Sequence, residues 1–235
     1  MGKAGVKNDT VSKCAEVEVD AHKAVDNREC AGVNTDANEK LGGESGKKNN
    51  TVTDSDIDKY RNELGNPLNT KTGEPLDTVA VGKTDVIGLE NKVFKGASPT
   101  VRTAAGLSSL DEQYPDRAIK APWDTRKRGY GQFTRHAEEG VMAEFEAAIK
   151  EAGIEDNDVK GNLYIHQSNS DGVCPMCTMG LFEESDKKGI FRQLTEKYPN
   201  LNIVVTTDTR NGVPSGRSSL TFNVIGGKVT NWTKK

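Results

Sequence analysis

Apolar runs are concentrated in the second half of this chain, which restricts where a packed core can form. Residues 1–50 contain almost no apolar run beyond Val17-Glu18-Val19, whereas residues 133–225 contain several. The hydrophobic content is 34%, below the roughly 45–50% of an average globular protein. We therefore expect the core in the second half and part of the first half outside it.

Residues 1–80 are rich in Asn, Asp, Lys, Glu, Gly and Thr, a composition typical of a linker or a weakly ordered region. One short helix is predicted at Ser55–Leu64, with Asp54 or Ser55 as its N-cap. From Val79 onward, short apolar pieces alternate with glycines. We therefore place a domain boundary at residue 80 and assign residues 81–235 to one folded domain.

The net charge of −3 does not indicate a general nucleic-acid-binding surface. Residues 94–235 carry a net charge of about +1 and residues 1–93 about −4, so only local basic patches remain for such contacts. No run approaches the roughly 18 apolar residues of a membrane span, and Met1–Thr10 lacks the apolar segment of a signal peptide. We expect neither element in this sequence.

Helices and strands follow one another in the second half. A helix is predicted at Glu138–Lys150, where an apolar stripe recurs at helical spacing and Gly153 provides a stop. Further helical segments are predicted at Cys174–Ser185 and Ile190–Tyr198.

Three strands are predicted at Leu163–His166, Leu201–Thr206 and Leu220–Ile225. The turn residues Asn211–Gly216 join the last two without a helix between them, which favours an antiparallel pair.

Two short motifs carry candidate metal ligands. His136-Ala137-Glu138 begins the first predicted helix, and Cys174-Pro175-Met176-Cys177 begins the next. Cysteines at i and i+3 share one face of a helical turn, where the helix N-terminus stabilises thiolates. With His136 as the third ligand, a tetrahedral zinc keeps one position open for water, as catalytic zinc sites do.

Glu138 is the candidate proton carrier. In a regular helix its offset from His136 would splay the two side chains by roughly 200°, so the pair must straddle the helix start. Glu138 then faces the water and can move its proton to a substrate nitrogen. A redox dithiol or a structural zinc finger would also use Cys-x-x-Cys, but a second ligand pair is missing apart from Cys14 and Cys30. Those two cysteines are either a disulfide or free thiols.

These residues resemble the signature of the cytidine deaminase-like zinc enzymes, which is His-x-Glu followed by Pro-Cys-x-x-Cys. His136, Glu138, Cys174 and Cys177 match it, while Val173 stands before the first cysteine where the family has proline. The resemblance implies Zn²⁺ as the cofactor and Glu138 as the catalytic residue.

The run Leu163–Cys174 is similar to the strand and loop of the bacterial polymorphic-toxin deaminases, including toxins that deaminate cytosine in DNA. This resemblance covers about Tyr114–Val229 and implies an α/β cytidine deaminase-like fold, a mixed five-stranded sheet flanked by helices whose last two strands are antiparallel. It also implies conversion of cytosine to uracil in nucleic acid, DNA rather than RNA. The chain would belong to a larger secreted antibacterial toxin that acts in the target-cell cytoplasm and has a cognate immunity protein.

Substrate-binding candidates lie on both sides of the helix start. Basic and aromatic residues interleave in 123–135, where cations suit phosphates and rings suit stacking on a base. A solvated loop with core aromatics is the alternative interpretation. The resemblance implies that the Ala137 N–H points at the base carbonyl, and His166 either contacts substrate or closes its strand. The full set of candidates is Arg128, Tyr130, Phe133, Arg135, Ala137, His166 and Ser168.

Two other functions stay open at this point. A deaminase of free cytidine, cytosine or another small molecule would have a closed pocket and lack a use for the basic and aromatic loop. A non-catalytic zinc-stabilised binding module would take a fourth protein ligand, and Glu138 would then only complement the helix dipole.

Overall fold

The computed structural model describes residues 51–76, 78–122, 135–212 and 220–232. The chain divides into two compact units, Met1–Lys47 and Lys48–Lys235, and every described residue belongs to the second. The boundary predicted at residue 80 therefore lies inside this unit. Cys14 and Cys30 lie outside the described residues.

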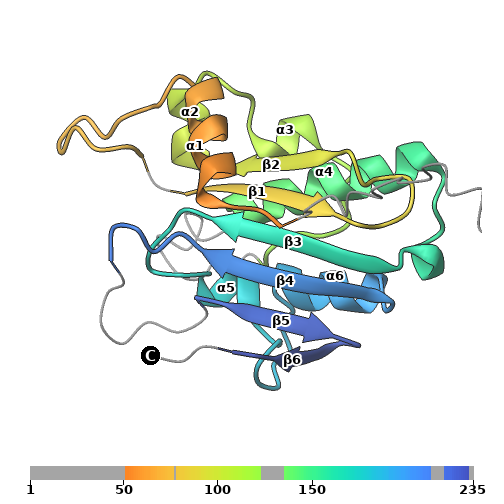
Figure 1. The fold of residues 1–235 in the computed structure, drawn as a ribbon. Coiled ribbons are helices and arrows are strands. Elements are labelled where there is room, and N and C mark those ends of the chain that lie inside the picture. Colours follow the sequence, from red (N-terminus) through yellow and green to blue (C-terminus); the bar gives the residue numbers. More distant parts are fainter. Residues whose placement is uncertain (1–50, 77, 123–134, 213–219, 233–235) are drawn as a thin grey trace, which may run out of the picture. The chain divides into compact units, whose positions relative to one another are not determined.

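The described strands form one mixed sheet in the order β2-β1-β3-β4-β5-β6 (Figure 1). They are β1 (Val79–Thr84), β2 (Val93–Ala97), β3 (Gly161–Gln167), β4 (Leu201–Thr207), β5 (Phe222–Ile225) and β6 (Lys228–Thr230). β3 and β4 are parallel, and all other neighbours are antiparallel. The predicted mixed α/β sheet and the antiparallel pairing of β4 with β5 are confirmed.

The predicted count of five strands is wrong, because β6 adds a sixth strand beside β5. Gly226 and Gly227, with φ of 56° and 74°, form the two-residue turn between them. Such turns need positive φ at both central residues, which glycine adopts at little cost. β6 is only three residues long, too short to show a hydrophobic alternation in the sequence.

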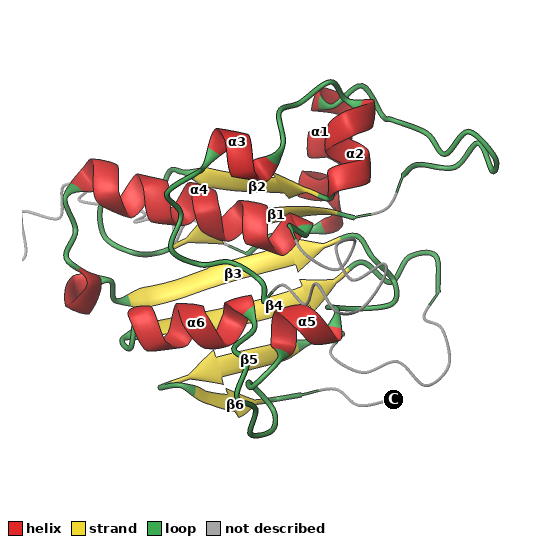
Figure 2. Cartoon of the chain, turned by 180° about the vertical axis from the view of Figure 1, so that it is seen from behind, coloured by secondary structure: helices red, strands yellow, loops and turns green. Residues whose placement is uncertain are grey.

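Helices cover both faces of the sheet. They are α1 (Asp54–Glu63), α2 (Pro99–Ala104), α3 (Leu110–Gln113), α4 (Ala137–Ala152), α5 (Pro175–Thr178) and α6 (Ile190–Lys197), with a 3₁₀ turn at Asp156–Asp158. α4, α5 and α6 lie on the face seen in Figure 2, and α1 lies on the face seen in Figure 1. None of the helices in the described ranges has the length and apolar character needed to cross a membrane.

α4 is the central helix of the larger core, and its predicted amphipathic stripe is confirmed. Val141, Met142, Phe145 and Ile149 are at most 3% exposed. Each such side chain stabilises the fold by about 1.5–3 kcal/mol relative to an exposed position. The helix ends as predicted at Gly153, which has a φ of 67°.

α1 belongs to the folded unit, although the composition of residues 1–80 suggested a linker. Ile57 and Tyr60 are buried in a second apolar cluster with residues of β1. Thr53, rather than Asp54 or Ser55, is the N-cap. Its backbone N–H donates to the Asp56 carboxylate at 2.9 Å, as in a capping box.

α5 is shorter than the predicted helix at Cys174–Ser185. It ends at Thr178, and Gly180 follows in a left-handed conformation with a φ of 72°. The predicted helix at Ile190–Tyr198 is confirmed as α6, with Phe191 and Leu194 fully buried.

Candidate metal centre

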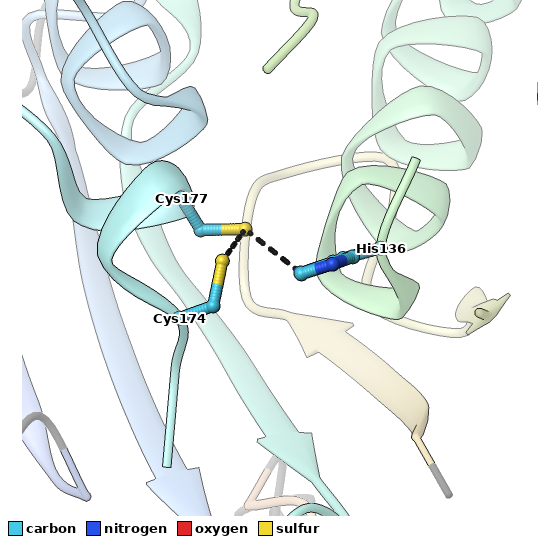
Figure 3. A group of neighbouring side chains, drawn as sticks. All are labelled: His136, Cys174 and Cys177. Carbon is cyan, nitrogen blue, oxygen red and sulfur yellow. Dashed lines mark hydrogen bonds between the residues drawn. The ribbon is translucent and has the colours of Figure 1, made fainter. Parts of the chain in front are cut away.

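The fold brings the three predicted metal ligands together (Figure 3). The ligand atoms of His136, Cys174 and Cys177 all lie within 4.8 Å of one another. Cys177 Sγ is 3.5 Å from Cys174 Sγ and 3.5 Å from His136 Nδ1. Ligands held about 2.0–2.3 Å from a tetrahedral zinc lie roughly 3.5–4 Å apart, so these spacings fit such an ion.

Two helix starts position these side chains. His136 is the N-cap of α4 and has an extended backbone, with φ −67° and ψ 169°. Glu138 lies inside the first helical turn. The two residues therefore straddle the helix start, as the sequence predicts. Cys174 is the N-cap of α5 and Cys177 lies within it, so the i and i+3 spacing places both sulfurs on one side of the turn.

The cysteines are partly or fully withdrawn from solvent. Cys177 is buried, whereas Cys174 and His136 are half-buried. The hydrogen bond with the Cys177 sulfur, together with the nearby His136 ring, lowers the pKa of Cys174 to about 5. The thiolate is the form of cysteine that binds metal, so the site favours a ligand at neutral pH.

Glu138 lies beside the three ligands in an unusual state for a carboxylate. It is 2% exposed, and its Oε2 atom has no hydrogen-bond partner among the described residues. Burial raises the pKa of the Glu138 carboxyl. A buried polar atom without a partner is costly and therefore points to a group that the site is built to meet.

The chemistry of the donor set fits zinc. One imidazole nitrogen and two sulfurs are ligands that zinc prefers, and three protein ligands leave one tetrahedral position open. The partnerless oxygen of Glu138 is next to this position in the chain, two residues from His136. The residues present therefore fit a zinc ion with an open coordination position.

The substrate-binding candidates are only partly within the described residues. Arg128, Tyr130 and Phe133 lie outside them. Arg135 donates from Nε to the Asp111 carboxylate at 2.8 Å. Ala137 is fully buried as the first residue of α4. Both therefore adjoin the metal ligands through the chain.

His166 and Ser168 are not brought to the metal ligands. His166 Nε2 lies 2.7 Å from Asp54 Oδ1 of α1 and Nδ1 lies 2.7 Å from Thr206 Oγ1. The Ser168 hydroxyl accepts hydrogen bonds from Arg61 and from the Val79 backbone, each at 3.0 Å.

The reason is the alternation of side chains along β3. Leu163 and Ile165 belong to the core cluster that also contains Cys177. The next residue of the strand, His166, faces α1 on the other side of the sheet. The alternation in the sequence could have shown this.

The sequence interpretation missed a buried ion pair beside the ligands. Glu139 is 0% exposed and pairs with the buried Arg117 at 2.7 Å. Charged residues after a helix start were expected to face solvent. Glu139 nevertheless lies three residues before Met142, on the apolar stripe of α4, and this spacing was an available signal.

Two cavities in the described part of the chain lie elsewhere. One of about 480 Å³ is lined by residues 180–186 with Lys188 and Arg192. The other, of about 270 Å³, lies between α1, α3 and α4 near Glu144. Neither is lined by His136, Cys174, Cys177 or Glu138, so neither enters the chemistry proposed below.

The candidate site thus joins one histidine, two cysteines and one buried carboxylate at the starts of α4 and α5. Comparisons with protein-family models, with curated proteins and with solved structures each found no match to this chain.

Proposed function

We propose that this chain is a zinc-dependent hydrolytic deaminase of the cytidine deaminase-like fold that converts cytosine to uracil in nucleic acid, with DNA as its substrate. One observation carries the proposal. The carboxylate of Glu138 is buried with a partnerless oxygen beside a nitrogen and two sulfurs that suit zinc. This combination is what metal-assisted removal of an amino group requires.

His136, Cys174 and Cys177 would hold the zinc ion. When bound there, zinc supplies a Lewis acid that makes water acidic near neutral pH. Glu138 accepts a proton from the attacking water and delivers it to the ring nitrogen of cytosine. Glu138 then carries the second proton to the amino group, which leaves as ammonia. Cytosine and water thus give uracil and ammonia.

The raised pKa of Glu138 suits this cycle. A carboxyl group whose pKa is moved upward by burial accepts and returns a proton near neutral pH more readily than an exposed one. The backbone N–H of Ala137, between His136 and Glu138, is proposed to orient the base carbonyl.

Sequence features support a nucleic-acid substrate over a free nucleoside. Lys127, Arg128 and Tyr130 belong to the basic and aromatic segment that runs directly into His136. Cations for phosphates and rings for stacking suit a flipped or single-stranded base. With the resemblance to polymorphic toxins, this supports a role within a larger secreted toxin that acts in the target-cell cytoplasm and is neutralised by an immunity protein.

The ligand count supports catalysis over a structural zinc module. The candidate group in the described residues offers three ligand atoms, one each from His136, Cys174 and Cys177. A closed structural site takes four. Glu138 is also more deeply buried than a carboxylate needs to be if it only complements a helix dipole.

The decisive variant is Glu138→Ala. General acid-base groups contribute about 10²–10⁴-fold in rate, and Glu138 would act in both water attack and ammonia departure. The purified variant should therefore lose at least about 10³-fold of its deaminase rate while keeping zinc and melting near the parent temperature. A variant with intact zinc and fold that retains more than about a tenth of the rate would overturn the mechanism.

Glu144→Gln is a matched control. Glu144 lies on the same helix, and burial raises its pKa as well. It lies about 9 Å further along the helix axis and accepts the Lys95 backbone N–H at 2.6 Å. This variant should keep the parental rate.

Sequencing of nucleic acid from cells that briefly express the chain identifies the substrate. We expect C-to-T changes in DNA that disappear with Glu138→Ala. C-to-U changes confined to RNA would redirect the proposal to RNA. Faster turnover of free cytidine than of any oligonucleotide would replace it with a small-molecule deaminase.

A further inference from the structure

Glu139 and Arg117 form a buried ion pair next to the candidate metal centre. Glu139 Oε1 accepts from Arg117 Nη2 at 2.7 Å and from Nε at 3.1 Å. Arg117 also donates to the Tyr114 carbonyl at 3.0 Å and to the Asp111 carboxylate at 2.7 Å. Buried charges persist when they are paired and hydrogen-bonded in this way. Nothing in the deaminase chemistry itself uses this pair.

The other oxygen of Glu139 binds the backbone at two places. Oε2 accepts the N–H of Ala121 at 3.2 Å and the N–H of Arg135 at 3.1 Å. One carboxylate oxygen therefore ties two separate points of the chain to the first turn of α4. The second of these points is the residue directly before the ligand His136.

Arg135 has a backbone conformation that needs such support. Its φ is 59°, in the left-handed region that residues with a side chain rarely adopt. The N–H bond to Glu139 and the side-chain bond to Asp111 hold Arg135 from both sides. Because φ of Arg135 sets the direction in which the chain reaches His136, these contacts decide where the imidazole lies.

We propose that Glu139, anchored by Arg117, is a positioning residue that holds Arg135 in its left-handed conformation and thereby places the His136 imidazole against the two cysteines. The inference rests on the metal site of the proposed function. It adds a requirement that the ligands themselves do not state: full metal affinity needs a buried carboxylate that touches no ligand side chain.

A second buried carboxylate of α4 provides a matched comparison. Glu146 is 8% exposed, accepts the Ile119 backbone N–H at 3.2 Å and pairs with Lys197 at 2.6 Å. It therefore ties the same preceding segment to the same helix. Glu146 lies about 10 Å further along the helix axis than Glu139, so its contacts do not reach Arg135.

The first experiment compares Glu139→Gln with Glu146→Gln in the full chain. Thermal melting reports the fold, and competition with a chromophoric chelator reports zinc affinity. Residues that orient metal ligands typically contribute about 10–100-fold in affinity. We expect Glu139→Gln to lose at least about tenfold and to change the absorption spectrum of the cobalt(II)-loaded protein. Glu146→Gln should keep parental zinc affinity and the parental cobalt spectrum.

A second pair of variants tests the backbone link at a half-exposed position. Arg135→Gly and Arg135→Val both remove the side-chain bond to Asp111, but only glycine adopts positive φ without cost. A β-branched residue there is a conformational outlier. We expect Arg135→Gly to bind zinc more tightly than Arg135→Val, and Arg135→Gly to restore part of the affinity that Glu139→Gln loses. This pair decides the matter if Glu139→Gln does not fold.

The outcomes are distinct. Equal zinc affinity in the two Arg135 variants, or equal losses in Glu139→Gln and Glu146→Gln, would overturn the positioning role while leaving the metal site in place. A parent protein that binds no zinc would instead overturn the proposed function.

Discussion

Gly96 of β2 lies directly against Ala137 of α4. A Cβ atom at Gly96 would overlap with the Ala137 carbonyl oxygen and lie 2.8 Å from the Val141 nitrogen. Gly140 faces the same point, where its own Cβ would lie 2.8 Å from the Gly96 Cα. Ala137 separates His136 from Glu138, so this close contact sets where the start of α4 meets the sheet.

Gly96→Ala should therefore disturb both the fold and the metal centre. Overpacking typically costs about 1–3 kcal/mol, and here the obstacle is backbone that cannot rotate away. We expect a lower midpoint of chemical unfolding together with weaker zinc binding. Gly82→Ala is the control, because its Cβ would meet the Val141 side chain, which can adjust. Parental stability and zinc affinity in Gly96→Ala would contradict the tight contact.

The purified chain should hold one zinc ion. Cys174→Ala or Cys177→Ala should lose the ion and melt at the temperature of the metal-free parent, because three-ligand sites do not tolerate loss of a ligand. Metal content by mass spectrometry and thermal melting measure both effects. Cys14→Ala with Cys30→Ala is the control and should keep the zinc. Stoichiometric zinc in the double variant of Cys174 and Cys177 would refute the assignment.

Lys127 and Arg128 should contact substrate phosphates. They lie outside the described residues, so this prediction depends on the sequence alone. Reversing both charges should weaken oligonucleotide turnover and reduce the salt dependence of binding by about 0.7 per lost phosphate contact on a single strand. Reversing Lys150 and Lys160, exposed at or beyond the far end of α4, should change neither. Unchanged oligonucleotide kinetics in the Lys127 and Arg128 variant would favour a small-molecule substrate.

Arg210 should make stability depend on pH. It donates to Asp58 of α1 at 2.8 Å and to Asp208 after β4 at 2.7 Å. The hydrogen bonds from Arg210 lower the pKa of both carboxyl groups. A carboxyl whose folded pKa is lowered stabilises the fold above its unfolded pKa of about 3.9, and this contribution is lost as pH falls through the folded value.

Arg210→Ala should therefore be less stable than the parent at pH 7, by about 0.5–1 kcal/mol because the contacts are partly exposed. The difference should shrink as the pH falls below about 4. Thermal melts from pH 2 to 8 test this, and a difference that stays constant over the whole range would contradict it. Arg210→Lys keeps the charge and should retain part of the effect.

Local patterns in the sequence predicted most of the regular elements. The apolar spacing of α4 and α6, and the β-branched run of β4, are visible within a single window, because each element repeats its own period. Gly153 ends α4 where its residue type predicts an end. The His136 and Cys174-Pro175-Met176-Cys177 motifs likewise identified the ligands, since coordination chemistry restricts which residue types can serve.

Elements whose role depends on distant partners were harder to predict. α1 is polar in composition and folds because Ile57 and Tyr60 meet β1. His166 was placed with the substrate because of its residue type, and the sheet directs it to Asp54 on the opposite face.

The sequence by itself determined which side chains can bind metal and transfer a proton, because residue type sets donor atoms and local spacing sets which of them begin a helix. Tertiary structure alone decided that Glu138 is buried with an oxygen lacking a partner in the described residues, and that Glu139 ties Arg135 and Ala121 to α4. Burial and hydrogen bonding between residues far apart in the chain arise only when the whole chain is packed, and no local period encodes them.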